Sequence, residues 1–164
     1  LFYMGTGGMK IEFSRCIKES FAVIGKEGFT GDGAGVIRQL WEDANSNFGE
    51  VAHLAKKDEK GNLAGVWGVM SDINRSFLPW EEGFTKGLYL AGVECEEGAE
   101  APEGWTRWVV PGFEYAYTEK ENEDTFSGVL EYLAENGLEL AGAVQEFNCP
   151  ETRKEYLFFP IRRL

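Results

Sequence analysis

Glu155 is the acidic residue whose position most suggests chemistry in this chain. It opens the closing run EYLFFPI, residues 155–161, in which apolar residues dominate. Alternate side chains of a strand point to the same face, so Glu155 shares a face with Leu157 and Phe159. A carboxylate is costly to bury there unless it is paired or hydrogen-bonded. We therefore expect Glu155 to be the buried acid of a pocket, although the pattern also fits an exposed first residue of a strand.

Aromatic side chains are the second signal, because they make up 14% of the residues. Packing in the core explains most single rings, but aromatic rings also stack on flat ligands and attract cations. Trp80, in a loop beside Pro79, is harder to explain as core. We expect Trp67, Tyr89 and Glu155 to converge on one cavity. The full set of expected ligand-binding residues is Glu155, Leu157, Trp41, Trp67, Trp80, Tyr89, Tyr115 and Tyr117.

Other site chemistries find little support in the sequence. There is no GxSxG nucleophile motif and no GxxxxGK[ST] phosphate-binding loop. With a single histidine, His53, a zinc site is not expected, and we expect no cofactor. The three cysteines, Cys16, Cys95 and Cys149, are scattered without a CxxC motif. Such an odd set favours reduced thiols and a cytoplasmic protein.

Charge and hydropathy limit the partners. The net charge of −12 repels phosphate backbones, so this chain alone is expected to bind no nucleic acid. It would attract cations and basic partners, although solubility is the simplest reason for an acidic surface. No apolar run approaches the ~20 residues of a membrane span. The first ten residues do not resemble a signal peptide, and we expect no membrane partner.

Periodicity predicts the same order of elements in both halves of the chain. Helical spacing covers residues 35–47, with Asp32 as a cap, and residues 124–136, capped by Asp124 and ended by Gly137. Strands are expected at residues 18–27, 64–71, 87–94, 105–110, 113–118, 143–148 and 155–161. Each half then reads strand, helix, strand, strand.

This order predicts an α+β fold with tandem pseudo-symmetric βαββ repeats. Two such units side by side would form one antiparallel sheet, with helices on one side and a ligand cleft at the seam. We place the repeats at about residues 11–95 and 105–163, separated by the acidic segment 96–104, within one domain of residues 11–164. Residues 1–10 are expected to be a leader or linker. Since the chain begins with Leu1, we expect either a piece of a longer protein or a start made of added residues.

Five short motifs resemble the gyrase-inhibitor-like effector-binding domain. They are KESFAVIG, WGVMSD, GLYLAGVE, PGFEYAY and the closing EYLFFPI, and the resemblance covers about residues 9–163. This module occurs alone and as the C-terminal half of AraC-type and MerR-type transcription regulators. The resemblance implies a tandem βαββ fold around a cleft. It also implies a glutamate in the closing strand that receives cationic lipophilic drugs, matched here by Glu155, with Leu157 lining the cleft.

The resemblance leaves three functions open. The first is a multidrug-type sensor of cationic or aromatic molecules, whose DNA-binding half would lie elsewhere in an AraC-type regulator. The second is a hydrolase that opens strained cyclopropane rings of DNA-alkylating natural products, with Glu155 acting beside Tyr89, Tyr115 or Tyr117. The third is a protein that contacts gyrase. We rank the sensor first, because the sequence offers one clear acid and no obvious catalytic partner for it.

Overall fold

The computed structural model describes residues 2–4, 9–11 and 13–164, with side chains from Phe13 onward. Two short strands, β1 (Phe2–Met4) and β2 (Met9–Ile11), pair beside α3. Of the expected leader, residues 1 and 5–8 lie outside the described part. The helices are α1 (Val36–Ser46), α2 (Glu81–Phe84) and α3 (Asp124–Glu135), and short 3-10 turns cover Thr30–Asp32, Phe48–Glu50 and Ala52–Leu54.

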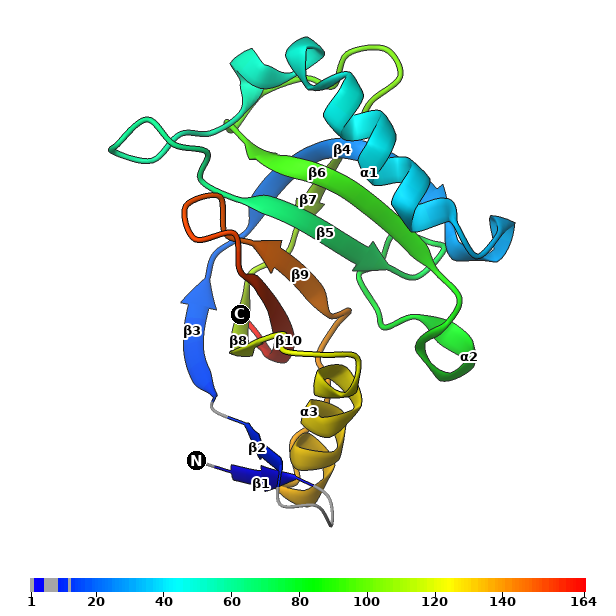
Figure 1. Ribbon diagram of the computed structural model, residues 1–164, viewed down its shortest axis with the longest axis vertical. Helices are drawn as coiled ribbons and strands as arrows, with labels where there is room; N and C mark the ends of the chain where they lie inside the picture. Colours follow the sequence, from blue (N-terminus) through cyan, green and yellow to red (C-terminus); the bar gives the residue numbers. More distant parts are fainter. Residues whose placement is uncertain (1, 5–8, 12) are drawn as a thin grey trace.

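The other strands form one eight-stranded antiparallel sheet, which confirms the expected α+β class (Figure 1). They are β3 (Ser14–Lys18), β4 (Phe21–Phe29), β5 (Val66–Ser71), β6 (Leu88–Cys95), β7 (Thr106–Val110), β8 (Phe113–Glu119), β9 (Gln145–Asn148) and β10 (Glu155–Arg163). Their order across the sheet is β3-β8-β10-β9-β5-β6-β4-β7.

The sheet has a central seam between β5 and β9. Outward from the seam the order is β5, β6, β4 on one side and β9, β10, β8 on the other. In chain order these groups are β4-α1-β5-β6 and β8-α3-β9-β10. That is the order expected of two βαββ units, while their pseudo-symmetry and the repeat boundaries remain predictions.

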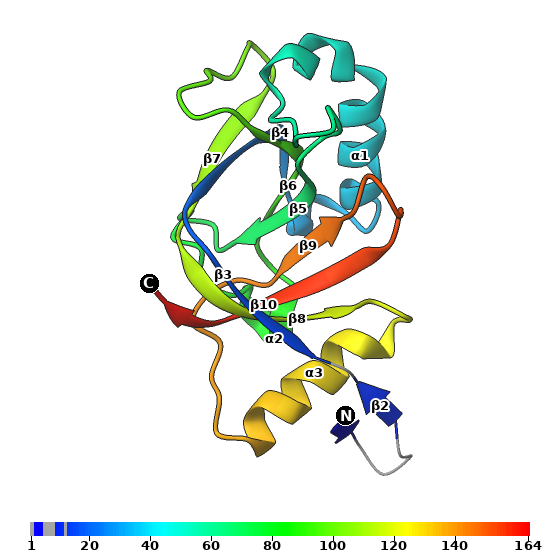
Figure 2. The ribbon, with the colours of Figure 1, turned by 90° about the vertical axis from the view of Figure 1, so that its left-hand side faces the viewer.

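Two pairs of consecutive strands each form a long arm, and these arms curl the sheet. The chain runs from β3 into β4 across Glu19 and Ser20, and from β7 into β8 across Pro111 and Gly112. The arms pair with each other, because β4 pairs with β7 and β3 pairs with β8. Figure 2 shows both arms bending around the same side of the molecule. Each half of the chain therefore supplies an outer strand to the other half.

The two faces of the curled sheet carry different cores. On one face, α1 packs its Ile37 and Leu40 against the cluster that contains Ile24, and α3 packs Val129 and Leu133 against the strand β10. The opposite face buries a second, helix-free core of large side chains. Its buried members are Phe21, Val23, Trp67, Val69, Leu90, Trp108 and Val110. Both principal helices thus cover one face, and the seam strands β5 and β9 run between them.

Helix ends differ in part from the expectation. Asp32 lies in a 3-10 turn, and α1 begins after Gly35 without a side-chain cap, so the predicted Asp32 cap is wrong. Asp124 is the first residue of α3, and its own N–H donates to the side-chain oxygen of Asn122 at 2.8 Å. The cap predicted at Asp124 is wrong because the preceding loop supplies this acceptor. Gly137, with φ of 67°, ends α3 as predicted.

The segment 96–104 connects β6 to β7 and is attached to the first half of the chain. Ala99 and Ala101 pack against the core beneath α1. Lys26 of β4 donates to the carbonyl of Gly104 at 2.7 Å and lies over the ring of Trp105, 4.2 Å from its centroid. The segment therefore packs against the first half of the chain and is hydrogen-bonded to it, although it joins the two expected repeats.

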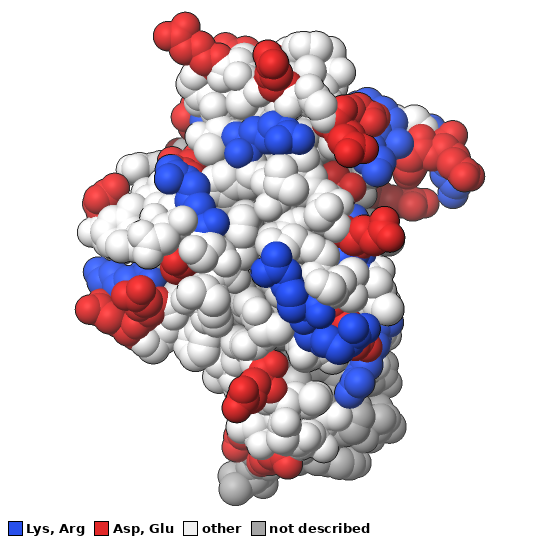
Figure 3. Space-filling view, turned by 180° about the vertical axis from the view of Figure 1, so that it is seen from behind, with Lys and Arg blue, Asp and Glu red and all other residues white. Residues whose placement is uncertain are grey.

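Charge is not gathered into one patch on the face seen from behind. Despite the net charge of −12, acidic and basic side chains alternate around an uncharged centre (Figure 3). Some acids are held in ion pairs, such as Glu27 with Arg75 and Glu114 with Arg162. Among the helices in the described part of the chain, none has the length and apolar character needed to span a membrane.

Candidate functional site

A cleft with two adjoining pockets opens at the β5–β9 seam, on the face that carries α1 and α3. The apolar pocket, of about 210 Å³, is lined by Met70, Pro79, Trp80, Phe84, Lys120, Glu123, Phe126, Ala143, Val144, Glu146 and Leu157. The polar pocket, of about 310 Å³, is lined by Trp41, Asn45, Val66, Tyr89, Glu146, Asn148 and Glu155. Glu146 belongs to both pockets, so it stands at the centre of the cleft.

Glu146 is held by a chain of hydrogen bonds that crosses the seam. The hydroxyl of Tyr89, on β6, donates to Glu146 Oε1 at 2.5 Å. The indole Nε1–H of Trp41, on α1, donates to the same hydroxyl oxygen at 2.9 Å. A helix and two strands thus fix one carboxylate, with the donors from the first half of the chain and the acceptor from the second.

Gly68 leaves the space that the Tyr89 hydroxyl and the Glu146 carboxylate occupy. It lies opposite Glu146 in the β5–β9 ladder. A Cβ atom at this position would overlap the Tyr89 hydroxyl and come within 2.6 Å of the Glu146 carboxylate. Because Tyr89 is itself 1% exposed, its ring has little space to move aside. A glycine is therefore required here for its size.

The electrostatics leave Glu146 without a direct counter-ion. Burial raises the pKa of Glu146, the Tyr89 hydrogen bond and the charge of Lys120 lower it, and the charge of Glu155 raises it, so that the net pKa is raised. Burial and the neighbouring Glu146 charge raise the pKa of Tyr89 well above its ordinary value, so Tyr89 stays a protonated donor. No ion pair joins Glu146 to any described residue. Its charge is available to a ligand.

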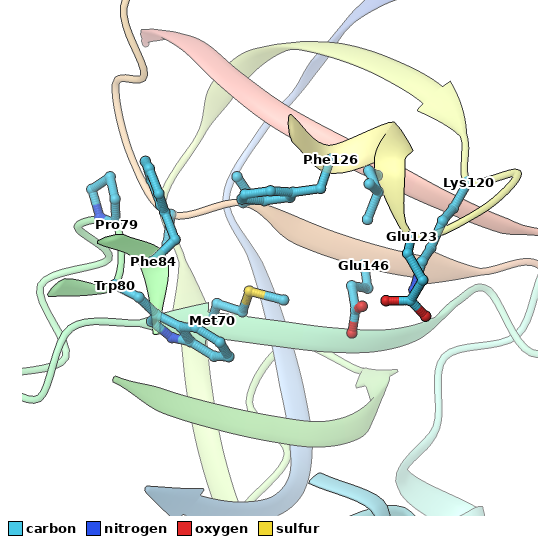
Figure 4. Close-up of a pocket in the computed structure, with 11 residues that line it drawn as sticks. Met70, Pro79, Trp80, Phe84, Lys120, Glu123, Phe126 and Glu146 are labelled. Atoms are coloured by element: carbon cyan, nitrogen blue, oxygen red, sulfur yellow. The ribbon is translucent and has the colours of Figure 1, made fainter. Parts of the chain in front are cut away.

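The apolar pocket has an aromatic end and a charged end (Figure 4). Trp80 and Phe84 stand at one end, and Glu146, Glu123 and Lys120 gather at the other. Trp80 is anchored, because its Nε1–H donates to the carbonyl of Leu88 at 2.9 Å. Phe84 makes an edge contact with Phe126 of α3, with ring centroids 5.7 Å apart. The arrangement suits a molecule with an apolar body and a positive charge.

The prediction of Glu155 as the buried acid is wrong. Its side chain is 54% exposed and lies at the rim of the polar pocket, 3.8 Å from the ammonium of Lys120. Glu155 is the first residue of β10 and pairs with Asn148, the last residue of β9, so it stands where the ladder ends. The expected face is nevertheless confirmed, because Leu157 and Phe159 pack against α3.

Glu146 was missed by sequence reasoning, although a signal was present. The run AVQEFN, residues 143–148, was expected to be a strand, and Glu146 alternates with Val144 and Asn148 on one side of it. A carboxylate on the same strand face as an apolar residue such as Val144 is costly to bury unless it is paired or hydrogen-bonded, which makes it a candidate site residue. The short strand β9 does place Glu146 in the middle of its ladder with β10.

The structure brings together only some of the expected pocket residues. Trp41, Trp80, Tyr89 and Leu157 line the cleft, with Glu155 at its rim. The residues on the opposite face are Trp67, Tyr115 and Tyr117.

The expected convergence of Trp67 with Tyr89 is wrong for a reason of register. Trp67 pairs with Gly92, whereas Tyr89 pairs with Met70, so the two side chains point to opposite faces. Trp67 instead donates its indole N–H to Glu94 at 3.1 Å. Tyr115 is fully buried beside Phe158, and Tyr117 stacks on the same ring, with centroids 4.8 Å apart.

Comparisons with known proteins identify the fold class. No protein-family model matches the chain, and no curated protein does. Solved structures do match, and they confirm the α+β fold expected from the resemblance to gyrase-inhibitor-like effector-binding domains. One is SAV2435, solved bound to tetraphenylphosphonium, with a TM-score of 0.63 and 18% identity over 93% of this chain and 94% of that chain.

Two further structures share this fold. The C-terminal domain of EcmrR has a TM-score of 0.63 and 10% identity, over 95% of this chain and 100% of that domain. A putative bacterial transcription regulation protein from Staphylococcus aureus MU50 has a TM-score of 0.57 and 14% identity, over 93% of this chain and 99% of that chain. At such identities the likeness establishes the fold alone.

Proposed function

We propose that this chain binds lipophilic cations in the seam cleft, with Glu146 as the carboxylate that receives the charge. The observation that carries the proposal is a half-buried carboxylate with no ion pair among the described residues, oriented by Tyr89 and placed beside an aromatic pocket. The match to SAV2435, a structure that holds a lipophilic cation, supports the same ligand class.

The physical argument concerns how the charge of Glu146 is compensated. An ionised carboxylate loses part of its hydration when it is half-buried, and one hydroxyl donor compensates only part of that loss. A cation in the cleft would compensate the charge of the carboxylate, and the low local dielectric would strengthen the attraction between the two ions. Trp80 and Phe84 would add contact area and cation–π attraction on the other side of the ligand.

Titration of tetraphenylphosphonium tests this proposal. We expect Glu146→Gln to weaken binding at least about tenfold, because the amide keeps the shape and the Tyr89 contact but loses the charge. Glu139→Gln, at an exposed position outside the cleft, is the matched control and should bind as the unmodified protein does. Equal affinity in the Glu146 and Glu139 variants would exclude Glu146 from the binding mechanism.

We further propose that the chain is the sensor half of a bacterial transcription regulator. The EcmrR C-terminal domain supports this, because this chain covers all of that domain but 58% of the EcmrR chain in its DNA complex. The full reading frame of the gene tests the idea. A helix-turn-helix region upstream would agree with it, whereas a frame that holds this chain alone would contradict a DNA-binding half in the same protein.

A hydrolase is the second candidate, favoured by the contact between Glu146 and the Tyr89 hydroxyl. A carboxylate of raised pKa beside a phenol is suited to proton transfer. Glu155 and Tyr115 do not serve this role, since one is exposed and the other lies on the opposite face. Ring opening of an electrophilic cyclopropane that is lost in Glu146→Gln would support the enzyme, and no turnover above buffer would exclude it. We do not propose a gyrase contact, because none of the similar structures described above is said to bind gyrase.

A further inference from the structure

Lys120 brings a positive charge into the cleft. It follows β8, and its backbone N–H donates to the carbonyl of Glu155 at 2.9 Å. Its side chain lines the apolar pocket with Glu123 and Glu146, while its ammonium lies 3.8 Å from Glu155 Oε2. Figure 4 shows the side chains of Lys120 and Glu123 at the charged end of the pocket. The chain thus carries its own cation where a ligand cation would bind.

This lysine is held loosely in comparison with Lys18. The Lys18 ammonium lies 3.4 Å from Glu94 and 4.4 Å from the centroid of the Phe21 ring, with Trp67 at 5.7 Å. Lys120 has a longer ion pair, and no aromatic ring of the described residues makes a cation–π contact with its ammonium. The Lys120 side chain is 31% exposed and Glu155 is 54% exposed, so water competes for their contact. A ligand can displace this ammonium.

We infer that Lys120 is a specificity-determining residue that selects against ligands with two positive charges. The inference rests on the proposed function and deepens it. With Lys120 in place, Glu155 is already paired, and Glu146 is the carboxylate left for a ligand. A single positive charge can then bind at Glu146 with its apolar body against Trp80 and Phe84. A second positive charge would have to displace Lys120.

The size of the effect follows from electrostatics. Removing the positive charge of Lys120 changes the electrostatic potential in the cleft, and the binding free energy changes by that difference in potential multiplied by the ligand charge. The gain in affinity should therefore be larger for a dication than for a monocation, and it approaches the square of the monocation's gain when both charges lie at the same potential. A neutral ligand should gain no affinity, because the change in potential is multiplied by a ligand charge of zero.

Three probes of increasing charge test this scaling in the unmodified protein and in Lys120→Gln. They are triphenylphosphine oxide, tetraphenylphosphonium and p-xylylene-bis(triphenylphosphonium), and comparing each probe with itself cancels differences in size. We expect Lys120→Gln to bind the monocation about threefold more tightly and the dication about tenfold more tightly, with the neutral probe unchanged. These gains should shrink at raised salt.

Two further variants separate charge from other effects. Lys120→Arg keeps the charge and should bind all three probes as the unmodified protein does. Lys60→Gln removes the same charge from a side chain that is 75% exposed and pairs with Glu151, and it should also change nothing. Equal affinity changes for the three probes in Lys120→Gln, or none, would overturn the inference while leaving the proposed function intact. If no cation binds to the unmodified protein or to Lys120→Gln, the proposed function itself fails.

Discussion

Glu94 and Glu146 are carboxylates on opposite faces of one sheet, and their surroundings differ. Glu94 accepts the indole N–H of Trp67 at 3.1 Å and lies 3.4 Å from Lys18 and 3.9 Å from Lys56. Glu146 also accepts one aromatic donor, the Tyr89 hydroxyl, but it has no ion pair with a described residue. The charge of Glu94 is neutralised within the chain, whereas that of Glu146 faces two pockets.

The comparison shows how one structural pattern serves two purposes. An aromatic donor and a buried carboxylate stabilise the fold when a lysine completes the group, as at Glu94. A half-buried carboxylate with such a donor but without an ion pair of its own to a described residue forms a receptor for an external cation, as we propose for Glu146. What distinguishes the two is the cation partner, because both carboxylates have an aromatic hydrogen-bond donor.

The largest expected effect concerns stability. Glu94→Gln should lower the free energy of unfolding by about 2–3 kcal/mol, because it leaves Lys18 without its counter-ion. This value is smaller than for a fully buried pair, because Lys18 and Lys56 are both partly exposed. Glu146→Gln should change it by less than about 1 kcal/mol, since the amide oxygen still accepts from Tyr89. Urea unfolding of both variants measures the difference. Equal losses would show that the two carboxylates play the same structural role.

A second, smaller change tests the space at the seam. Gly68→Ala should lower the free energy of unfolding by about 1–2 kcal/mol and weaken binding of tetraphenylphosphonium, because the new methyl group separates Tyr89 from Glu146. Gly49→Ala is the control, since no atom lies within 4 Å of a Cβ placed there. Unaltered cation affinity in Gly68→Ala would mean that the contact between Tyr89 and Glu146 is not needed for binding.

The smallest expected effect is a dependence on pH. Because the pKa of Glu146 is raised in the fold, the protonated form stabilises the folded state. The contribution of Glu146 to the free energy of unfolding therefore grows as the pH falls through its raised pKa. Below the pKa of an ordinary glutamate, this contribution stays constant. Cation affinity should move the opposite way, falling towards about tenfold per pH unit below the raised pKa. In Glu146→Gln this dependence should disappear, which calorimetric titration across the pH range can check.

Much of the fold could be predicted from the sequence because hydrophobic periodicity records which face of an element is buried. The stripe at Val129 and Leu133 packs against β10 as expected, and Gly137 ends α3. The run EYLFFPI places Leu157 and Tyr156 on opposite faces of a real strand. These features depend on local spacing, which a single sequence contains.

The site was less predictable because it depends on contacts between distant segments. Whether Trp67 shares a face with Tyr89 is decided by the register of β5 against β6, and a shift of one residue reverses the answer. The identity of the central acid depends on where each strand ends, which local patterns define poorly. Glu155 stands at such an end, whereas Glu146 lies opposite Gly68 across the seam.

The two long arms, β3 with β4 and β7 with β8, limit how the chain can be divided into independent pieces. Three ladders join residues before the segment 96–104 to residues after it, namely β3 with β8, β4 with β7 and β5 with β9. A protease that cuts within this segment would leave every one of these ladders in place, so the nicked protein should remain associated. Produced as separate polypeptides, the two pieces would each lack the neighbour of an outer strand. They should therefore assemble as a complementing pair and fail to fold as independent domains.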